Sequence, residues 1–263
     1  MAVSIHKGPD GPRPAEVPRR GGRSPIPYAS AEVAWTAAAV FTVALAIYLR
    51  TMLPGTSFWD TAEAQTVPHT LSIFHPTGFP TYTLLGWLWS QLPFGSIAWR
   101  MNLLSGVSVA GAAGLVVLIT AQLVAERHRL TVAAAAGTGG LLFAFASEPW
   151  RNAVRADVHA VHILIAALLI WLLVSWSSAF RAESPRADRW LLVAALTFGI
   201  GMGNHPLTGV MAPGIAAWLI LVDPEIWRRW RLIAGCAALL ALGLAVYAYI
   251  LLRAHIAPEP PLF

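Results

Sequence analysis

The chain has 263 residues, of which 57% are apolar and only 12% are charged, and its mean hydropathy is +0.61. Soluble domains carry about a quarter charged residues and disordered chains have low hydrophobicity, so both classes are excluded for most of the length. The lone cysteine, Cys236, excludes a disulfide scaffold. The net charge of +5 comes almost entirely from arginines in short clusters between apolar runs, which indicates membrane topology and not binding to nucleic acid. The composition therefore predicts an all-α protein that crosses a membrane several times.

The predicted elements follow an N-terminal tail. Residues 1–28 are rich in proline, glycine and arginine and predict a disordered cytoplasmic tail, and we expect residues 29–263 to form one membrane module. A spanning helix needs about 17–25 apolar residues. Runs of that length occupy residues 31–49, 101–124, 131–147, 158–176 and 231–252. The apolar stretch 190–222 is too long for one span and predicts a hairpin with the arms 190–203 and 206–222.

The run 81–92 is too short to span and lies between two prolines, which favours a re-entrant or interfacial helix. The basic residues test this interpretation. If residues 81–92 do not cross and the N-terminus is cytoplasmic, seven spans place 13 of the 18 basic residues on the cytoplasmic side. A spanning 81–92 would exchange the sides of three arginine clusters. The positive-inside rule therefore predicts seven transmembrane helices with a long first outer loop over residues 50–100.

The predicted outer side carries a pair of acids and a histidine in a stiff turn. Asp60 and Glu63 are three residues apart, so they share one face of a helix. Two neighbouring carboxylates disfavour each other's ionised form, which makes one a candidate proton acceptor, although a solvated helix face is an alternative. His75 lies in a turn stiffened by two prolines and a glycine, which can hold an imidazole against a substrate or carry a histidine without a role. The acids and a histidine could also bind a divalent cation.

Two further outer segments place polar residues at the ends of spans. Arg155, Asp157 and His159 lie where a span begins, and ionisable groups at that depth usually face a cavity, the alternative being an ion pair that anchors the helix. Asn204 and His205 end an arm of 14 residues, which is ~21 Å long and shorter than the hydrocarbon core. His205 should therefore lie below the outer surface, in protein or in a wet cavity, unless the segment is only a helix-breaking turn.

These segments occur in an order that resembles a known family. The order is Asp60-x-x-Glu63, then His75-Pro-x-Gly-aromatic-Pro-x-Tyr82, then Trp150 followed by Asp157-Val158, and finally Gly203-Asn204-His205, with Asn102 and Ser105 also fitting the pattern. It resembles the GT-C superfamily of membrane glycosyltransferases, and within it the bacterial family related to the animal endoplasmic-reticulum transmembrane protein O-mannosyltransferase. The motifs extend over about residues 54–255. The chain departs from the family pattern at Thr77, Asp157 and His159, where proline, glutamate and tyrosine are usual.

The resemblance implies a seven-span GT-C module whose first outer loop carries horizontal helices. It implies transfer of a sugar such as mannose, with inversion, from a polyprenyl-phosphate donor to a hydroxyl of a protein or glycan on the extracytoplasmic side of a bacterial plasma membrane. Asp60 would be the catalytic base, and Glu63 would orient the acceptor or help bind a cation. The substrate- and lipid-phosphate-binding residues would be His75, Arg155, Asp157, His159, Asn204 and His205.

Two alternatives to an enzyme stay open. A small-molecule transporter would carry its ionisable groups near the bilayer midplane, whereas the polar residues here gather at one predicted side. A non-catalytic subunit or degenerate paralogue would keep the fold without the activity. Many members of the family are longer, so the chain is either a minimal core or a fragment that stops at its C-terminus.

Overall fold

A computed structural model describes residues 30–124 and 128–256 of the chain. Within those ranges the protein is entirely helical, with no strand, which confirms the predicted all-α class. The predicted tail, residues 1–28, lies outside the described residues. The helices are α1 (Ala31–Thr51), α2 (Trp59–Thr70), α3 (Pro80–Ser90), α4 (Ile97–Leu123), α5 (Arg129–Ala144), α6 (Ser147–Ala153), α7 (Val158–Arg181), α8 (Ala187–Asn204), α9 (Leu207–Val210), α10 (Ala212–Val222), η1 (Ile226–Arg228), α11 (Trp230–Leu244), η2 (Ala245–Tyr247) and α12 (Ala248–His255).

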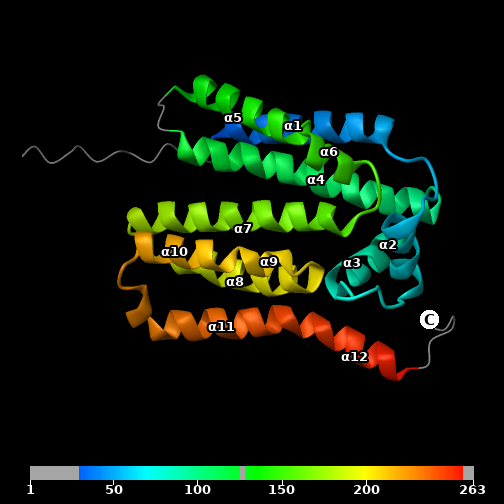
Figure 1. Cartoon of the computed structure of the whole chain (residues 1–263). Helices are drawn as coiled ribbons and strands as arrows, with labels where there is room; N and C mark the ends of the chain where they lie inside the picture. Colours follow the sequence, from blue (N-terminus) through cyan, green and yellow to red (C-terminus); the bar gives the residue numbers. More distant parts are fainter. Residues whose placement is uncertain (1–29, 125–127, 257–263) are drawn as a thin grey trace, which may run out of the picture.

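The long helices lie side by side in a layered bundle (Figure 1). α1, α4 and α5 form one side, α7 lies in the middle, α8 and α10 follow, and α11 forms the other side. Glycines allow the closest approach, which is between α8 and α11. A Cβ atom added at Gly199 would lie 2.3 Å from the carbonyl oxygen of Leu240, so the two backbones are in direct contact there. The short helices α2 and α3 gather at one end of the bundle, beside the first residues of α4 and α7.

Length and apolar composition support part of the predicted topology. The helices α1, α4 and α7, and the continuous stretch Trp230–His255, are each long and apolar enough to cross a membrane. α5 and α6 count as a fifth span only if taken together, since they meet at an angle of 65°. The predicted span 131–147 is therefore wrong at its end, because α5 stops at Ala144 and the chain turns before α6. All seven predicted runs are mostly helical, whereas the count of seven spans stays a prediction.

The predicted first outer loop contains two separate helices. α2 has 12 residues and α3 has 11, and 11 residues extend only ~16 Å, about half of the hydrocarbon core. The helix over Pro80–Ser90 thus has the length predicted for a segment that does not span. Side-chain caps fix the helices that flank this region, because the hydroxyl of Ser96 accepts from the amide of Trp99 and the carboxylate of Asp157 accepts from the amide of His159.

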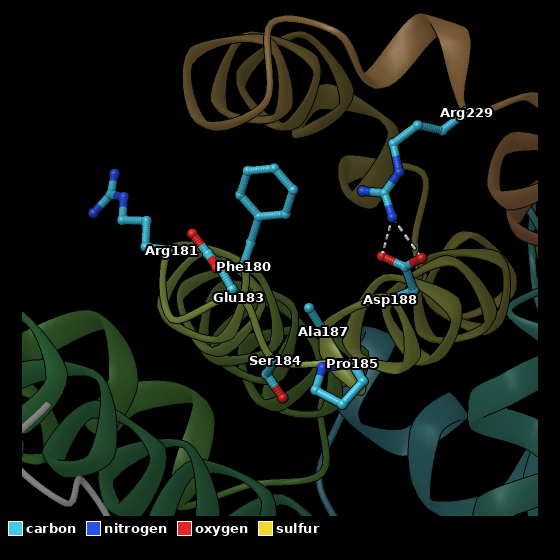
Figure 2. Close-up of a pocket in the computed structure, with 8 residues that line it drawn as sticks. All are labelled: Phe180, Arg181, Glu183, Ser184, Pro185, Ala187, Asp188 and Arg229. Carbon is cyan, nitrogen blue, oxygen red and sulfur yellow. Dashed lines mark hydrogen bonds and ion pairs between the residues drawn. The ribbon is translucent and has the colours of Figure 1, made fainter.

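The opposite end of the bundle is held by a charge network between helices (Figure 2). The guanidinium of Arg229 donates to both oxygens of Asp188 at 2.5 Å and to Asp223 at 3.2 Å. It also lies 5.8 Å from the ring of Phe180. Arg229, Asp188 and Phe180 line a pocket of about 520 Å³, together with Arg181 at the C-terminal end of α7. The network joins the start of α8 to the connection between α10 and α11.

Candidate active site

A cavity of about 540 Å³ brings together predicted site residues that are far apart in the sequence. Helices α2 and α7 and the segments before α3, after α6 and after α8 each contribute to its wall. Six of the eight predicted residues line it: Asp60, His75, Arg155, Asp157, His159 and His205. The cavity lies at the end of the bundle where α2 and α3 gather (Figure 1). The structure therefore forms one site from segments up to 145 residues apart.

Asp60 and Glu63 share one face of α2 but have different surroundings. Asp60 is exposed, and among the described residues its carboxylate has no hydrogen bond or ion pair. Both oxygens of Glu63 are occupied, since Oε1 accepts from the backbone amide of His75 at 2.7 Å and Oε2 lies 2.5 Å from Nδ1 of the same residue. Asp60 is thus available to a substrate, whereas Glu63 holds the turn that carries His75.

The turn after α2 places His75 against the cavity. The amide of Gly78 donates to the carbonyl of His75 at 2.8 Å, and Gly78 has a φ of +87°, which glycine adopts without strain. Phe79 then stacks on the ring of His205, with centroids 5.5 Å apart and an angle of 11° between the planes. Thr81 donates from its hydroxyl to the carbonyl of Ile200, which ties the start of α3 to α8. The turn is therefore fixed on both sides.

Asp157 caps α7 and holds two cationic side chains. Its Oδ1 accepts from the backbone amide of His159 at 2.9 Å and from the ring Nδ1 at 2.8 Å, and Oδ2 lies 3.4 Å from Arg155. Burial opposes ionisation, but the bonds from His159 and the charge of Arg155 keep the pKa of Asp157 below its usual value. The carboxylate is therefore an ionised support for Arg155 and His159.

His205 faces the cavity with one free ring nitrogen. Its Nδ1 accepts from the amide of Leu207 at 3.1 Å, which assigns the ring proton to Nε2. The ring lies 4.7 Å from that of His159 between centroids. Burial, and then the nearby charge of His159, lower the pKa of His205. A neutral imidazole with a free N–H group is a hydrogen-bond donor for an anionic ligand.

Asn204, which we predict to contact the substrate, is not among the residues that line the cavity. Its side chain is fully buried and donates to the carbonyl of Val158 at 3.1 Å, so it joins the end of α8 to the start of α7. The sequence Asn204-His205 is the same whether the asparagine side chain binds a substrate or bonds to another helix. Only the packing of α7 against α8 separates the two roles.

A buried amide pair behind the cavity was not predicted as part of the site. Gln65 is 1% exposed, and its Nε2 donates to Oδ1 of Asn102 at 2.9 Å, while its Oε1 accepts from the amide of Ser57. Asn102 also accepts from the amide of Ala156 at 2.8 Å. The pair thus links α2, α4 and the segment before Asp157. The sequence shows only a glutamine inside a predicted helix, which does not indicate the residue to which its side chain bonds.

Three side chains could hold a cation. Asp60, Glu63 and His75 each offer one ligand atom, and these atoms lie within 4.8 Å of one another. Two carboxylates and an imidazole suit Mn²⁺ or a similar divalent ion. Binding would require Glu63 to exchange its bonds with His75 for bonds to the metal.

The cavity wall also includes Arg151 and Glu148. These residues form an ion pair at 2.6 Å, and neither was predicted as a site residue.

Long apolar helices with a polar cavity at one end define a membrane protein of the multi-pass class. Residues 60–231 match the family described as the protein O-mannosyl-transferase TMEM260 N-terminal domain. The match covers more than half of the chain, so the chain belongs to this family, and it includes all eight predicted site residues. This confirms the resemblance to O-mannosyltransferase-like membrane glycosyltransferases.

Two relatives carry the same name. The chain is 29% identical over 223 residues to the protein O-mannosyl-transferase TMEM260 of Mus musculus, which is 81% of this chain and 29% of that protein. It is 24% identical over 214 residues to the protein O-mannosyl-transferase tmem260 of Dictyostelium discoideum, which is 76% of this chain and 25% of that protein. The chain thus spans less than a third of the length of either relative. No solved structure matches it.

Proposed function

We propose that the protein is a membrane glycosyltransferase that moves a sugar from a polyprenyl-phosphate donor to a hydroxyl group. The observation that carries the proposal is an unengaged carboxylate, Asp60, in one cavity with Arg155 and His205. An acid that can accept a proton and hydrogen-bond donors that can hold a phosphate are the two kinds of group that this transfer needs. The names of both relatives favour mannose as the sugar and a protein hydroxyl as the acceptor.

In the proposed reaction the acceptor hydroxyl attacks the anomeric carbon of the donor. The new bond joins the acceptor oxygen to that carbon, and the bond from the carbon to the phosphate oxygen breaks with its electron pair staying on the phosphate. Asp60 takes the hydroxyl proton. Attack opposite the leaving phosphate inverts the anomeric centre. No redox step and no external co-reactant is required.

Arg155 and two histidines of the cavity stabilise the departing lipid phosphate. Arg155 suits this role because its planar guanidinium pairs with phosphate oxygens, and Asp157 holds it beside the cavity. His205 donates from Nε2, and His159 adds a second imidazole 4.7 Å away between ring centroids. Fixed donors of this kind gain strength in a site of low polarity, where charge develops on the leaving group. Glu63 supports the reaction by holding His75.

The proposed orientation puts the cavity on the extracytoplasmic side of a bacterial plasma membrane, with a cytoplasmic N-terminus. The distribution of arginines supports this orientation. A lipid-linked donor and a membrane-bound enzyme also share the bilayer, so the donor phosphate can reach a cavity at one end of the bundle. This placement at one end disfavours a transporter, whose ionisable groups would lie near the midplane.

The experiment is an assay of lipid-phosphate release. Purified protein in detergent would be incubated with polyprenyl-phosphate mannose, glucose or galactose and with a serine- and threonine-containing peptide. We expect release of polyprenyl phosphate and a glycopeptide with one of the donors, and release at least about 100-fold slower by Asp60→Asn. If well-folded protein releases no polyprenyl phosphate with any tested donor and acceptor, the result would favour the alternative of a non-catalytic subunit.

A further inference from the structure

The C-terminal helix α12 is bonded to the turn that follows α2, although the two are about 180 residues apart. Nε of Arg253 donates to the carbonyl of Leu71 at 2.5 Å, and NH2 of the same side chain lies 3.3 Å from the carbonyl of Thr70. The hydroxyl of Tyr249 donates to the carbonyl of Ser72 at 3.0 Å. Three successive carbonyls of one turn thus accept bonds from one helix.

These carbonyls need outside donors because they lie at the end of α2. The last carbonyls of a helix have no partner within it, and they carry the negative end of the helix dipole. α2 ends with Leu71 in the left-handed conformation, at a φ of 52°, which turns the chain away from the helix axis. A guanidinium supplies both charge and a fork of donors, so Arg253 caps this helix end from another part of the chain.

The same face of α12 also touches the far end of the turn. Tyr249 and Arg253 are four residues apart and therefore lie on one face of the helix. Between them, Ile250 packs on Gly78, where an added Cβ atom would lie 2.6 Å from Cδ1 of the isoleucine. The turn from Leu71 to Gly78 is thus held at both ends by α12, and His75 lies inside it.

We propose that Arg253 and Tyr249 are positioning residues for the site, acting through His75 and Glu63. Both lie beyond residues 60–231, the part of the chain that matches the family. When α12 is in place, the amide and ring of His75 reach Glu63, and Asp60 on the same helix face is left free. The expected effect of Arg253 and Tyr249 on catalysis rests on the proposed glycosyl transfer. Their expected effect on the structure of the turn is independent of it.

The first experiment measures the turn itself. Hydrogen exchange, followed by mass spectrometry of peptides covering residues 71–79, would compare the wild type with Arg253→Ala, Arg253→Lys and Tyr249→Phe in detergent. Arg228→Ala is the matched control, since Arg228 is an exposed arginine of η1, in the connection between α10 and α11. We expect faster exchange of residues 71–79 in Arg253→Ala and Tyr249→Phe, with α4 and the Arg228→Ala variant unchanged. Unchanged exchange of the turn in both variants would overturn the proposal.

The second experiment measures turnover with the donor that the wild type uses. We expect kcat to fall about tenfold in Arg253→Ala, as for loss of one charge-assisted hydrogen bond, with an unchanged KM for the donor and partial recovery in Arg253→Lys. The double variant Arg253→Ala/His75→Ala should lose no more than His75→Ala alone, because the arginine acts through that histidine. Fully additive losses would refute positioning. If the wild type shows no turnover, the proposed function fails while the exchange data still decide the role of α12. Tyr249→Phe and Arg253→Lys keep most of the packing if Arg253→Ala does not fold.

Discussion

Replacing Asp60 by asparagine removes the proposed base and little else. Asp60 is exposed at the start of α2, and no described residue bonds to its carboxylate. Loss of the charge near the helix N-terminus costs about 0.3–1 kcal/mol of stability at an exposed position. Loss of a positioned base lowers the rate about 10²–10⁴-fold, or roughly 2.7–5.4 kcal/mol of transition-state stabilisation. The effect on turnover should therefore be much larger than the effect on folding.

Glu63→Gln is the matched comparison because it is isosteric and lies on the same helix face. The glutamine oxygen can still accept from the amide of His75, but as a neutral acceptor, and the glutamine NH2 group, a donor, replaces the oxygen that faces the imidazole. That difference is about 1–1.5 kcal/mol, which corresponds to roughly a tenfold loss of turnover. The structure thus separates two acids that the sequence presents as equivalent.

The assay is single-turnover release of polyprenyl phosphate, with thermal unfolding of each variant as the folding control. We expect Asp60→Asn to lose at least 10-fold more turnover than Glu63→Gln, as follows from the two ranges. Undiminished release by well-folded Asp60→Asn would show that another group accepts the proton. A larger loss in Glu63→Gln would assign that role to Glu63.

The remaining predictions concern topology, metal and acid stability. If residues 81–92 do not cross, as the arginine distribution predicts, a cysteine placed at Ser96 should react with an impermeant reagent from the outer side only; labelling only from the cytoplasm would show that they cross. Treatment with EDTA should leave turnover unchanged, because both oxygens of Glu63 already bond to His75, and activity that is lost and then restored by Mn²⁺ would instead support a cation site. Asp157→Asn should lower the unfolding temperature at pH 7. The folded-state pKa of Asp157 is lowered, so its carboxylate stabilises the folded protein above the unfolded-state pKa of about 3.8, and this stabilisation is lost as the pH falls through the folded-state pKa. The unfolding temperatures of the wild type and of Asp157→Asn should therefore converge in acid. An equal difference between them at all pH values would contradict this.

The helices could be predicted from the sequence because each signal is local. The apolar runs around α1, α4, α7 and α11 are continuous, and a membrane span must satisfy its backbone hydrogen bonds within its own segment. Where the prediction was wrong, at the end of α5, the run is apolar to Ala146 and the bend depends on how α6 packs. The residues before and at the bend between α5 and α6 are equally apolar, so composition does not predict the angle between the two helices.

The site could be predicted only in part, because motifs identify residues but not partners. The resemblance selected eight residues, and six line one cavity. It did not indicate that Glu63 holds His75, that Asn204 bonds to α7, or that Arg253 caps α2. These contacts join residues 12, 46 and 182 positions apart, and they exist only after the helices have packed.

The two ends of the bundle show why an acid at one end is a candidate for chemistry and an acid at the other is not. Asp188 and Asp223 share the guanidinium of Arg229, so removal of the arginine would leave both acids without this partner and would chiefly cost stability. At the cavity, Asp157 is paired in the same manner with Arg155 and His159, but Asp60, which lines the same cavity, has no such partner among the described residues. A carboxylate that no side chain neutralises, facing cations that another acid already holds in place, gives a cavity in which a substrate can complete the charge balance. That asymmetry, more than any single motif, favours catalysis at this end of the molecule.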